Sequence, residues 1–245
     1  MRHLTVSEPE SVPDPRSRSR SSSAPSVAVD RVTVRFGDRA VLNGLSVRIS
    51  GPGIVAVMGP SGVGKTTLLH VVAGLVKVSS GSVSVDGLDG RPIAWVVQNS
   101  PILPGRSAQE NVALGAVIDG VEWQQAQESA LPVMASLGIA HLAGVHAYKL
   151  SGGERQRVAV ARAITSASPV IFADEPTASL DELSRELVCD ALSKAASEGA
   201  LVVVSTHDPV VAEIAQRVLH LSAGRISRDS IDENSGDDRE IEDAP

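Results

Sequence analysis

The chain has 245 residues, a length that suits one large domain or a core with a small subdomain. Hydrophobic residues make up 42% of it and aromatic residues only 2%, so aliphatic side chains must fill the core. The formal net charge is −7, the single cysteine excludes an internal disulfide framework, and no run approaches the roughly 18 apolar residues of a membrane span.

The two ends of the chain differ in composition from its body. Residues 7–25 are rich in Ser, Pro and Arg, and residues 228–245 hold eight acidic and two basic side chains. Neither end has enough apolar surface to offset the chain entropy lost on folding. We expect disordered tails over residues 1–25 and 228–245, with phosphorylation or lipid contact as alternatives for the first. The body is nearly neutral, which predicts no nucleic-acid partner.

The first predicted elements surround a glycine-rich loop. Alternating apolar residues predict strands over residues 27–35 and 41–49, the first interrupted once, and the apolar run over 54–58 is typical of a buried strand. Gly59-Pro60-Ser61-Gly62-Val63-Gly64-Lys65-Thr66 follows and fits the phosphate-loop pattern G-x-x-x-x-G-K-[S/T]. A predicted helix over 66–75 completes the strand–loop–helix order that this motif requires.

This loop predicts a phosphate-binding site. Its glycines let backbone N–H groups turn inward around phosphate oxygens, and the start of the next helix adds partial positive charge. Lys65 can reach the β- and γ-phosphates, and the hydroxyl group of Thr66 can ligate Mg²⁺. A glycine-rich turn with a chance lysine is the alternative, which the flanking strand and helix disfavour.

The middle of the chain predicts a helical insert. Strands are expected over residues 81–86 and 93–98, and helices over 107–118 and 122–137 with no strand between them. Leu150-Ser151-Gly152-Gly153-Glu154-Arg155-Gln156-Arg157 then leads into a helix over 152–165. Ser151, Gly152 and Gly153 thus form a second candidate anion site at a helix N-terminus. Further on, strands over 170–173 and 201–205 flank a helix over 183–197, the order of a parallel crossover.

The phosphate loop followed by LSGGERQR resembles the ATP-binding-cassette (ABC) ATPases over residues 26–227. The resemblance implies an α/β fold: a P-loop NTPase (RecA-like) core with an antiparallel β subdomain and an α-helical subdomain inserted at about residues 99–165. In this family the signature segment of one subunit covers ATP bound to the other. A head-to-tail dimer of identical or different ATPase subunits is therefore implied, with two ATP molecules in its interface.

The resemblance also assigns roles to single residues. Residues 170–175 resemble a Walker B strand, so Asp174 would hold Mg²⁺ with Thr66 and Gln98, and Glu175 would activate the attacking water. A solvated strand end is the alternative for these two carboxylates. His207 resembles the switch histidine that contacts the γ-phosphate, and with Glu175 and Lys65 completes the catalytic set. The residues assigned to ATP are Phe36, Gly59, Pro60, Ser61, Gly62, Val63, Gly64, Lys65, Thr66, Thr67, Gln98, Ser151, Gly152, Gly153 and Asp181.

Two of these assignments have alternatives that involve no function. Phe36 has the spacing of the family's adenine-stacking aromatic, but a half-buried phenylalanine at a strand end is equally ordinary. A lone histidine at a strand end, such as His207, is usually a surface residue. Asp181 ends Ala178-Ser179-Leu180-Asp181, which resembles the D-loop, and Gln98 resembles the Q-loop glutamine. Cys189 is interpreted as a small buried hydrophobic residue.

Intact motifs predict an active ATPase that uses ATP and Mg²⁺. Lacking a membrane span, such a transporter subunit would act at the inner face of the cell membrane with separate integral permease subunits. Residues 101–112 resemble ATPases of the lipoprotein-release and macrolide-export type, although similar segments occur in importers. The alternatives are a soluble ABC ATPase of DNA repair, chromosome maintenance or translation, and a binding module without ATPase activity. The sequence identifies neither the substrate nor the direction of transport.

Overall fold

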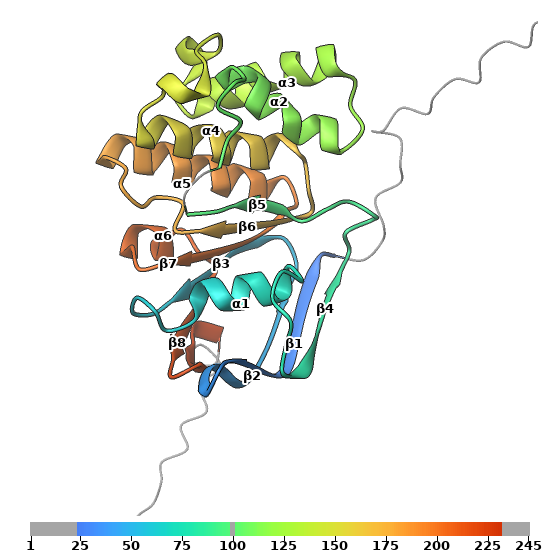
Figure 1. Ribbon diagram of the computed structural model, residues 1–245, viewed down its shortest axis with the longest axis vertical. Helices are drawn as coiled ribbons and strands as arrows, with labels where there is room; N and C mark the ends of the chain where they lie inside the picture. Colours follow the sequence, from blue (N-terminus) through green and yellow to red (C-terminus); the bar gives the residue numbers. More distant parts are fainter. Residues whose placement is uncertain (1–23, 99–100, 232–245) are drawn as a thin grey trace, which may run out of the picture.

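The computed structural model of the chain describes residues 24–98 and 101–231 (Figure 1). A three-stranded antiparallel sheet of order β2-β1-β4 contains β1 (Ser26–Phe36), β2 (Arg39–Ser50) and β4 (Ser80–Asp86). The predicted interruption of the first strand is a shift of register between Val29 and Val32, where Arg31 has φ 46°. Both valines are therefore buried although they are three residues apart.

A second sheet has six strands in the order β5-β6-β7-β3-β8-β9. Its strands are β3 (Gly53–Met58), β5 (Ala94–Val96), β6 (Val170–Asp174), β7 (Leu201–Thr206), β8 (Arg217–Ser222) and β9 (Arg225–Asp229). The pairs from β5 to β8 are parallel, and β9 pairs antiparallel with β8. The predicted crossover between β6 and β7 is confirmed.

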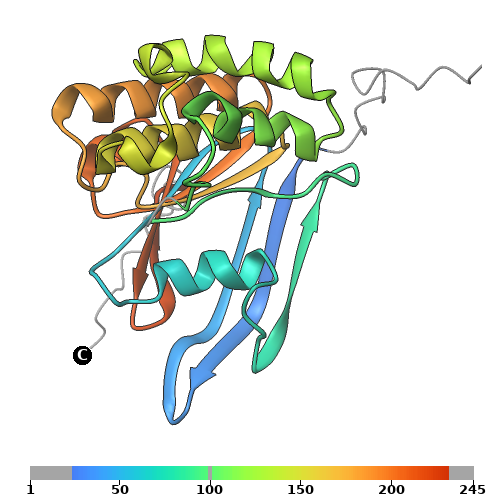
Figure 2. The same cartoon turned by 45° about the horizontal axis from the view of Figure 1, so that its top comes forward.

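The helices cover both faces of this sheet. They are α1 (Lys65–Val72), α2 (Ala108–Ile118), α3 (Trp123–Ser136), α4 (Gly152–Thr165), α5 (Glu182–Ser197) and the short α6 (Pro209–Glu213). Helix α1 lies between the two sheets, and α2 to α5 cover the opposite face (Figures 1 and 2). Within the described ranges, 24–98 and 101–231, every helix is too short or too polar to cross a membrane.

Two hydrophobic cores share the central strands. Along β6, Ile171 and Ala173 belong to the core with α2 to α5, whereas Val170 and Phe172 belong to the core with α1 and the antiparallel sheet. Side chains alternate between the faces of a strand, so a continuous apolar run supplies both cores. This double burial fixes the central strands, and with them the position of the loops that follow.

The helical insert is built from tight local contacts. Ser107 caps α2 in a capping box with Glu110. The buried amide of Asn111 donates to the carbonyl groups of Leu103 and Ser107 at 3.0 and 2.9 Å, which fixes the segment before the helix. A Cβ atom on Gly115 would lie 2.1 Å from the carbonyl oxygen of Arg162, so only glycine lets α2 approach α4 this closely.

Several predicted boundaries need correction. Helix α1 ends at Val72 rather than at residue 75, because Gly74 turns the chain with φ 73°. The predicted acidic tail starts too early, since β9 continues to Asp229, whose carboxylate is bound by the guanidinium group of Arg217. The rest of the two predicted tails, residues 1–23 and 232–245, lies outside the described residues. Strands β8 and β9 and helix α6 were not predicted.

Candidate functional site

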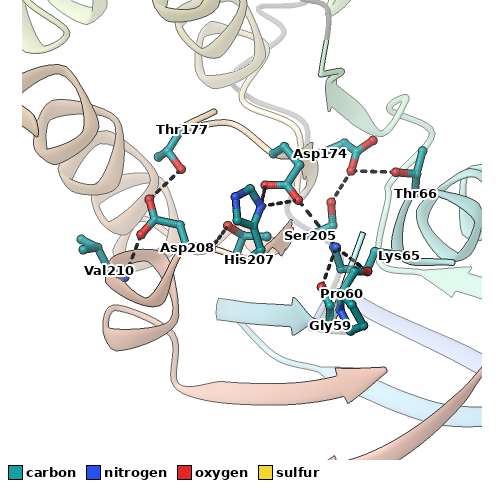
Figure 3. Close-up of polar contacts among 12 residues, drawn as sticks. Gly59, Pro60, Lys65, Thr66, Asp174, Thr177, Ser205, His207, Asp208 and Val210 are labelled. Atoms are coloured by element: carbon teal, nitrogen blue, oxygen red, sulfur yellow. Dashed lines mark hydrogen bonds and ion pairs between the residues drawn. The ribbon is translucent and has the colours of Figure 1, made fainter. Parts of the chain in front are cut away.

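The predicted site residues follow three neighbouring parallel strands. The phosphate loop follows β3, Glu175 follows β6, and His207 follows β7. These strands are adjacent in the order β6-β7-β3, so their carboxyl ends lie along one edge of the sheet. Ligands of open α/β sheets bind at this edge. Figure 3 shows the side chains gathered there.

The phosphate loop is packed directly against the core. Gly59 has φ 153°, and a Cβ atom there would lie 2.6 Å from the carbonyl oxygen of Leu221 on β8. The ammonium group of Lys65, only 6% exposed, donates to the carbonyl oxygens of Gly59 and Pro60 at 2.8 and 3.3 Å. Gly64 is the N-cap of α1 and has no side chain to bond the first N–H groups of the helix. Those groups can therefore bind an anion.

The carboxylate of Asp174 contacts one hydroxyl group from the start of α1 and one from the end of β7. The hydroxyl group of Thr66 donates to its Oδ1 atom at 3.1 Å, and the hydroxyl group of Ser205 donates to the same oxygen. Carboxylate and hydroxyl oxygens are ligands that Mg²⁺ prefers, so these residues fit the predicted metal. The sequence analysis missed Ser205, whose only signal was its place at the end of an apolar strand. Gln98 is exposed on the turn after β5, and the described contacts of Thr66 and Asp174 do not include it.

Glu175 connects the loop lysine with the histidine after β7. Its side chain is largely buried, and Oε1 lies 3.7 Å from Nζ of Lys65. Nδ1 of His207 lies 3.0 and 2.9 Å from the two carboxylate oxygens. An ionised carboxylate only accepts hydrogen bonds, so this contact requires the hydrogen on Nδ1. The imidazole is 72% exposed, so it can reach a ligand bound at the same edge.

Glu175 also has an unusual backbone conformation. Its φ of 49° is left-handed, which for a residue other than glycine costs of order 1–3 kcal/mol. Its N–H group donates to the carbonyl oxygen of Ser205 at 2.9 Å, and its carbonyl oxygen accepts from Ala178 at 3.1 Å. These bonds hold a sharp turn at the end of β6, next to Lys65 and His207. Strain of this kind is typical of functional sites.

The signature segment is organised around its own helix. Ser151 caps α4: its hydroxyl group accepts from the N–H group of Glu154 at 3.3 Å, and its own N–H group donates to the Glu154 carboxylate at 2.7 Å. This second bond lowers the pKa of Glu154. Gly152 and Gly153 form the first turn of the helix. The described contacts of Ser151 thus stay within its own turn, and none reaches the phosphate loop of the same chain.

The D-loop leads into α5 and packs against the start of the signature helix α4. Asp181 caps α5 by accepting from the N–H group of Ser184 at 2.8 Å, and this bond lowers the pKa of Asp181. Ser184 in turn receives a hydrogen bond from Arg157 of α4. A Cβ atom on Gly153 would lie 3.2 Å from the side chain of Leu180, so the start of α4 packs on the D-loop.

Two remaining predictions concern Phe36 and Cys189. Phe36 ends β1, is 56% exposed and pairs with Arg39 in the β1–β2 hairpin. The phosphate loop packs on this hairpin, because a Cβ atom on Gly64 would lie 3.1 Å from the side chain of Val41. Adenine stacking on Phe36 stays a prediction. Cys189 is buried on α5, and burial raises the pKa of its thiol to about 11, which confirms its interpretation as an inert core residue.

Beside Glu175 and His207 lies an open pocket of ≈ 280 Å³ that the sequence analysis did not predict. Thr177, Arg185 and Asp208 line it together with the two predicted catalytic residues. The hydroxyl group of Thr177 donates to Oδ2 of Asp208 at 3.2 Å, and Nε of Arg185 lies 3.1 Å from the same oxygen. The three residues come from different loops and helices, so no local sequence pattern connects them.

Comparisons with known proteins agree with this geometry. The sequence pattern of the ABC transporter family matches residues 42–178. The lipoprotein-releasing system ATP-binding protein LolD of Bacteroides thetaiotaomicron is 36% identical over 220 residues, which cover 83% of this chain and 100% of LolD. The macrolide export ATP-binding/permease protein MacB of Burkholderia thailandensis is 38% identical over 224 residues, 84% of this chain, but the chain spans only 34% of MacB.

A solved structure is similar over the same region. The ATP-binding cassette MJ0796, a dimer in a post-hydrolysis state bound to ADP and Pi, superposes with a TM-score of 0.76 and 30% sequence identity. The superposition covers 83% of this chain and 97% of that one. The phosphate loop, the paired carboxylates and the fold therefore have one explanation: the chain belongs to the ABC transporter family, as an ATP-binding ATPase cassette that powers transport.

Proposed function

We propose that the cassette hydrolyses Mg²⁺-bound ATP between the phosphate loop of one copy and the signature helix of a second. The main support is the contact chain Lys65–Glu175–His207 at one edge of the sheet, with distances of 3.7 and 2.9 Å. The start of the signature helix, by contrast, is exposed at Ser151 and Gly152, and one of its first N–H groups is bonded by its own cap. A second anion-binding helix start that does not reach its own phosphate loop is what a site shared between two copies requires.

The residues divide the reaction between them. The loop N–H groups and Lys65 bind the β- and γ-phosphates, and Phe36 stacks on the adenine. Thr66 and Asp174, together with Gln98, would hold Mg²⁺, which would neutralise charge on the phosphates when bound. Glu175 orients a water molecule and accepts its proton. His207 holds Glu175 through Nδ1 and directs the rest of its exposed ring toward the γ-phosphate. In the second copy, Ser151, Gly152, Gly153 and Asp181 complete the site.

The glutamate is the sharpest test of this assignment. We expect Glu175→Gln to lower the turnover number by roughly 10²- to 10⁴-fold, because the amide cannot accept a proton. ATP affinity measured by calorimetry should be retained, since the phosphate contacts remain. ATP should also drive the variant into a stable dimer on a sizing column.

The matched control is Glu198→Gln, which removes a carboxylate that is exposed at the end of α5. It should hydrolyse ATP as the unmodified protein does. Turnover by Glu175→Gln close to that of the unmodified protein would remove Glu175 from the proposed role. Loss of ATP binding in Glu175→Gln would instead indicate that Glu175 has a structural role in the site.

We further propose that a separate integral membrane permease is the partner of this cassette, at the inner face of the cell membrane. Two similarities support this: MacB is named as an ATP-binding/permease protein, and LolD is named as the ATP-binding protein of a lipoprotein-releasing system. The similarity to LolD and MacB favours export or release of a substrate from the membrane. The test is affinity purification of the tagged cassette from solubilised membranes, and recovery without any multi-span protein would contradict the proposal.

A further inference from the structure

Asp208 lies next to His207 but faces a different set of partners. Its side chain is only 15% exposed. Oδ1 accepts a hydrogen bond from the N–H group of Val210 at 3.0 Å and caps α6. Oδ2 accepts from the hydroxyl group of Thr177 at 3.2 Å, and it lies 3.1 Å from Nε of Arg185 in an ion pair that lacks hydrogen-bond alignment. The carboxylate thus contacts three separate parts of the chain.

These contacts close a ring between two loops. His207 and Asp208 are consecutive after β7, and they bind Glu175 and Thr177, which are two residues apart after β6 (Figure 3). The His207–Glu175 contact is at the exposed end of the ring, whereas Thr177 is 4% exposed. The contact between Asp208 and Thr177 lies deeper than the imidazole of His207, so it limits how far the two loops can separate at the Glu175–His207 contact.

The turn that carries Thr177 needs this support. Glu175 and Ser179, on either side of Thr177, have left-handed φ values of 49° and 64°. Two such residues store strain that neighbouring contacts must offset. The open pocket of ≈ 280 Å³ lies against the same turn, so packing on that side is incomplete. Besides the Glu175–His207 contact, the hydrogen bond from Thr177 to Asp208 connects the side chains of this turn to the loop of the histidine.

We infer that Asp208 is a positioning residue for hydrolysis, which holds Glu175 and His207 in contact by way of Thr177 and Arg185. This inference rests on the proposed function, in which Glu175 and His207 act on ATP. A displacement of about 1 Å in such a site is enough to lower a rate up to 100-fold. The ring therefore sets the rate of the chemical step and leaves the phosphate-binding contacts of Lys65 and Thr66 unchanged.

The test begins with Thr177→Val, which keeps the volume of the side chain and removes its hydroxyl donor. We expect the turnover number to fall about tenfold while the KM for ATP and the calorimetric affinity stay unchanged. Thr177→Ser restores a hydroxyl group and should recover most of the rate. Thr165→Val is the matched control, because that hydroxyl group bonds only to the carbonyl of Ala161 within α4; it should not change turnover.

The double variant Thr177→Val/Asp208→Asn separates positioning from independent structural effects. In a shared ring the two losses are not additive, so the double variant should be little slower than the slower single variant. Fully additive losses, or an unchanged turnover number in Thr177→Val, would overturn the inference. A loss of ATP affinity parallel to the loss of rate, without recovery in Thr177→Ser, would overturn it as well.

Glu175→Gln is measured beside these variants. If it hydrolyses ATP at the normal rate, the proposed function fails irrespective of the ring. If it is inactive while Thr177→Val is normal, only the role of Asp208 is wrong.

Discussion

Two of the described helix N-termini, those of α1 and α4, have glycines in or next to their first turn, and they are capped differently. Helix α1 starts after Gly64, which has no side chain to cap it, and Lys65 beside it is buried. Helix α4 starts after Ser151, which caps it in a reciprocal pair of bonds with Glu154. The first terminus is embedded in the core at β2 and β8, whereas the second is exposed.

This difference in capping indicates which of the two helix N-termini contributes more to the affinity for an anion. The N–H groups of α1 have no side-chain cap and the loop is already packed in place, so we expect it to bind an anion with little reorganisation of the backbone. The α4 terminus already holds an anion, the Glu154 carboxylate, whose pKa is lowered by the hydrogen bond from Ser151. We therefore expect the first terminus to determine ATP affinity and the second to act in turnover, when a second copy brings ATP to it.

Among changes at the two helix N-termini, the largest expected effect is on turnover, from Ser151→Arg. The added bulk and charge should obstruct both the γ-phosphate cover and the contact between two copies, and lower the hydrolysis rate about 100-fold. ATP binding to one copy should be normal by calorimetry, since Ser151 does not touch the phosphate loop of its own chain. Ser151→Ala is the milder comparison: it should lose the cap, about 1 kcal/mol of stability, and should lower turnover less than Ser151→Arg does.

A mixture of Ser151→Arg with Lys65→Ala tests whether the two sites of a dimer are coupled. One site is then damaged twice and the other keeps both residues. Activity that stays low indicates coupled sites, and partial recovery indicates independent ones. Full activity of Ser151→Arg by itself, or a rate that is linear in protein concentration with no dimer in ATP, would exclude the shared site.

The next effect is on affinity, from Lys65→Ala. Loss of a charged hydrogen bond to phosphate should weaken ATP binding by about 10- to 100-fold. Lys194→Ala is the control, because that lysine is exposed on α5 and pairs only with Glu198. Isothermal titration calorimetry measures both. An unchanged affinity in Lys65→Ala would show that the α1 terminus does not hold the phosphates.

The smallest effect, from Glu154→Gln, concerns the charge at the α4 terminus. The amide preserves the capping geometry but removes a charge that favours the helix N-terminus, which should lower stability by about 0.5 kcal/mol at neutral pH. The folded pKa of Glu154 is lowered, so its contribution is complete above the ordinary value of about 4.3 and disappears as the pH falls through the folded pKa.

Urea unfolding at neutral pH and at about pH 3 tests whether the stabilisation by Glu154 is lost on acidification. The difference in the free energy of unfolding between Glu154→Gln and the unmodified protein should be smaller at the lower pH. Glu186→Gln, in the middle of α5, should show no such difference, since it lies away from a helix N-terminus. A difference that grows on acidification would contradict the assignment of charge to the α4 terminus.

The sequence by itself determined the parts that depend on neighbours along the chain. Apolar alternation predicted β1 and β2, short apolar runs predicted β3, β6 and β7, and β4 and β5 were also expected. The glycine spacing located the phosphate loop, because strand pattern and loop conformation are local properties. The cap at Ser151 and the bounds of α4 followed from the same kind of signal. The family resemblance added candidate roles that the residues would not otherwise have carried.

Only the tertiary structure decided which distant residues meet. Thr66 and Asp174 are 108 positions apart, and their contact depends on β7 lying between β6 and β3. Three other contacts also depend on the tertiary structure. They are the hydrogen bonds from Thr177 to Asp208 and from Ser205 to Asp174, and the ion pair between Arg217 and Asp229. Strands β8 and β9 escaped prediction because β9 is the edge strand and β8 is next to it, where burial is partial and the apolar pattern is weak. Strand order is set by the burial of both sheet faces at once, which no short segment encodes.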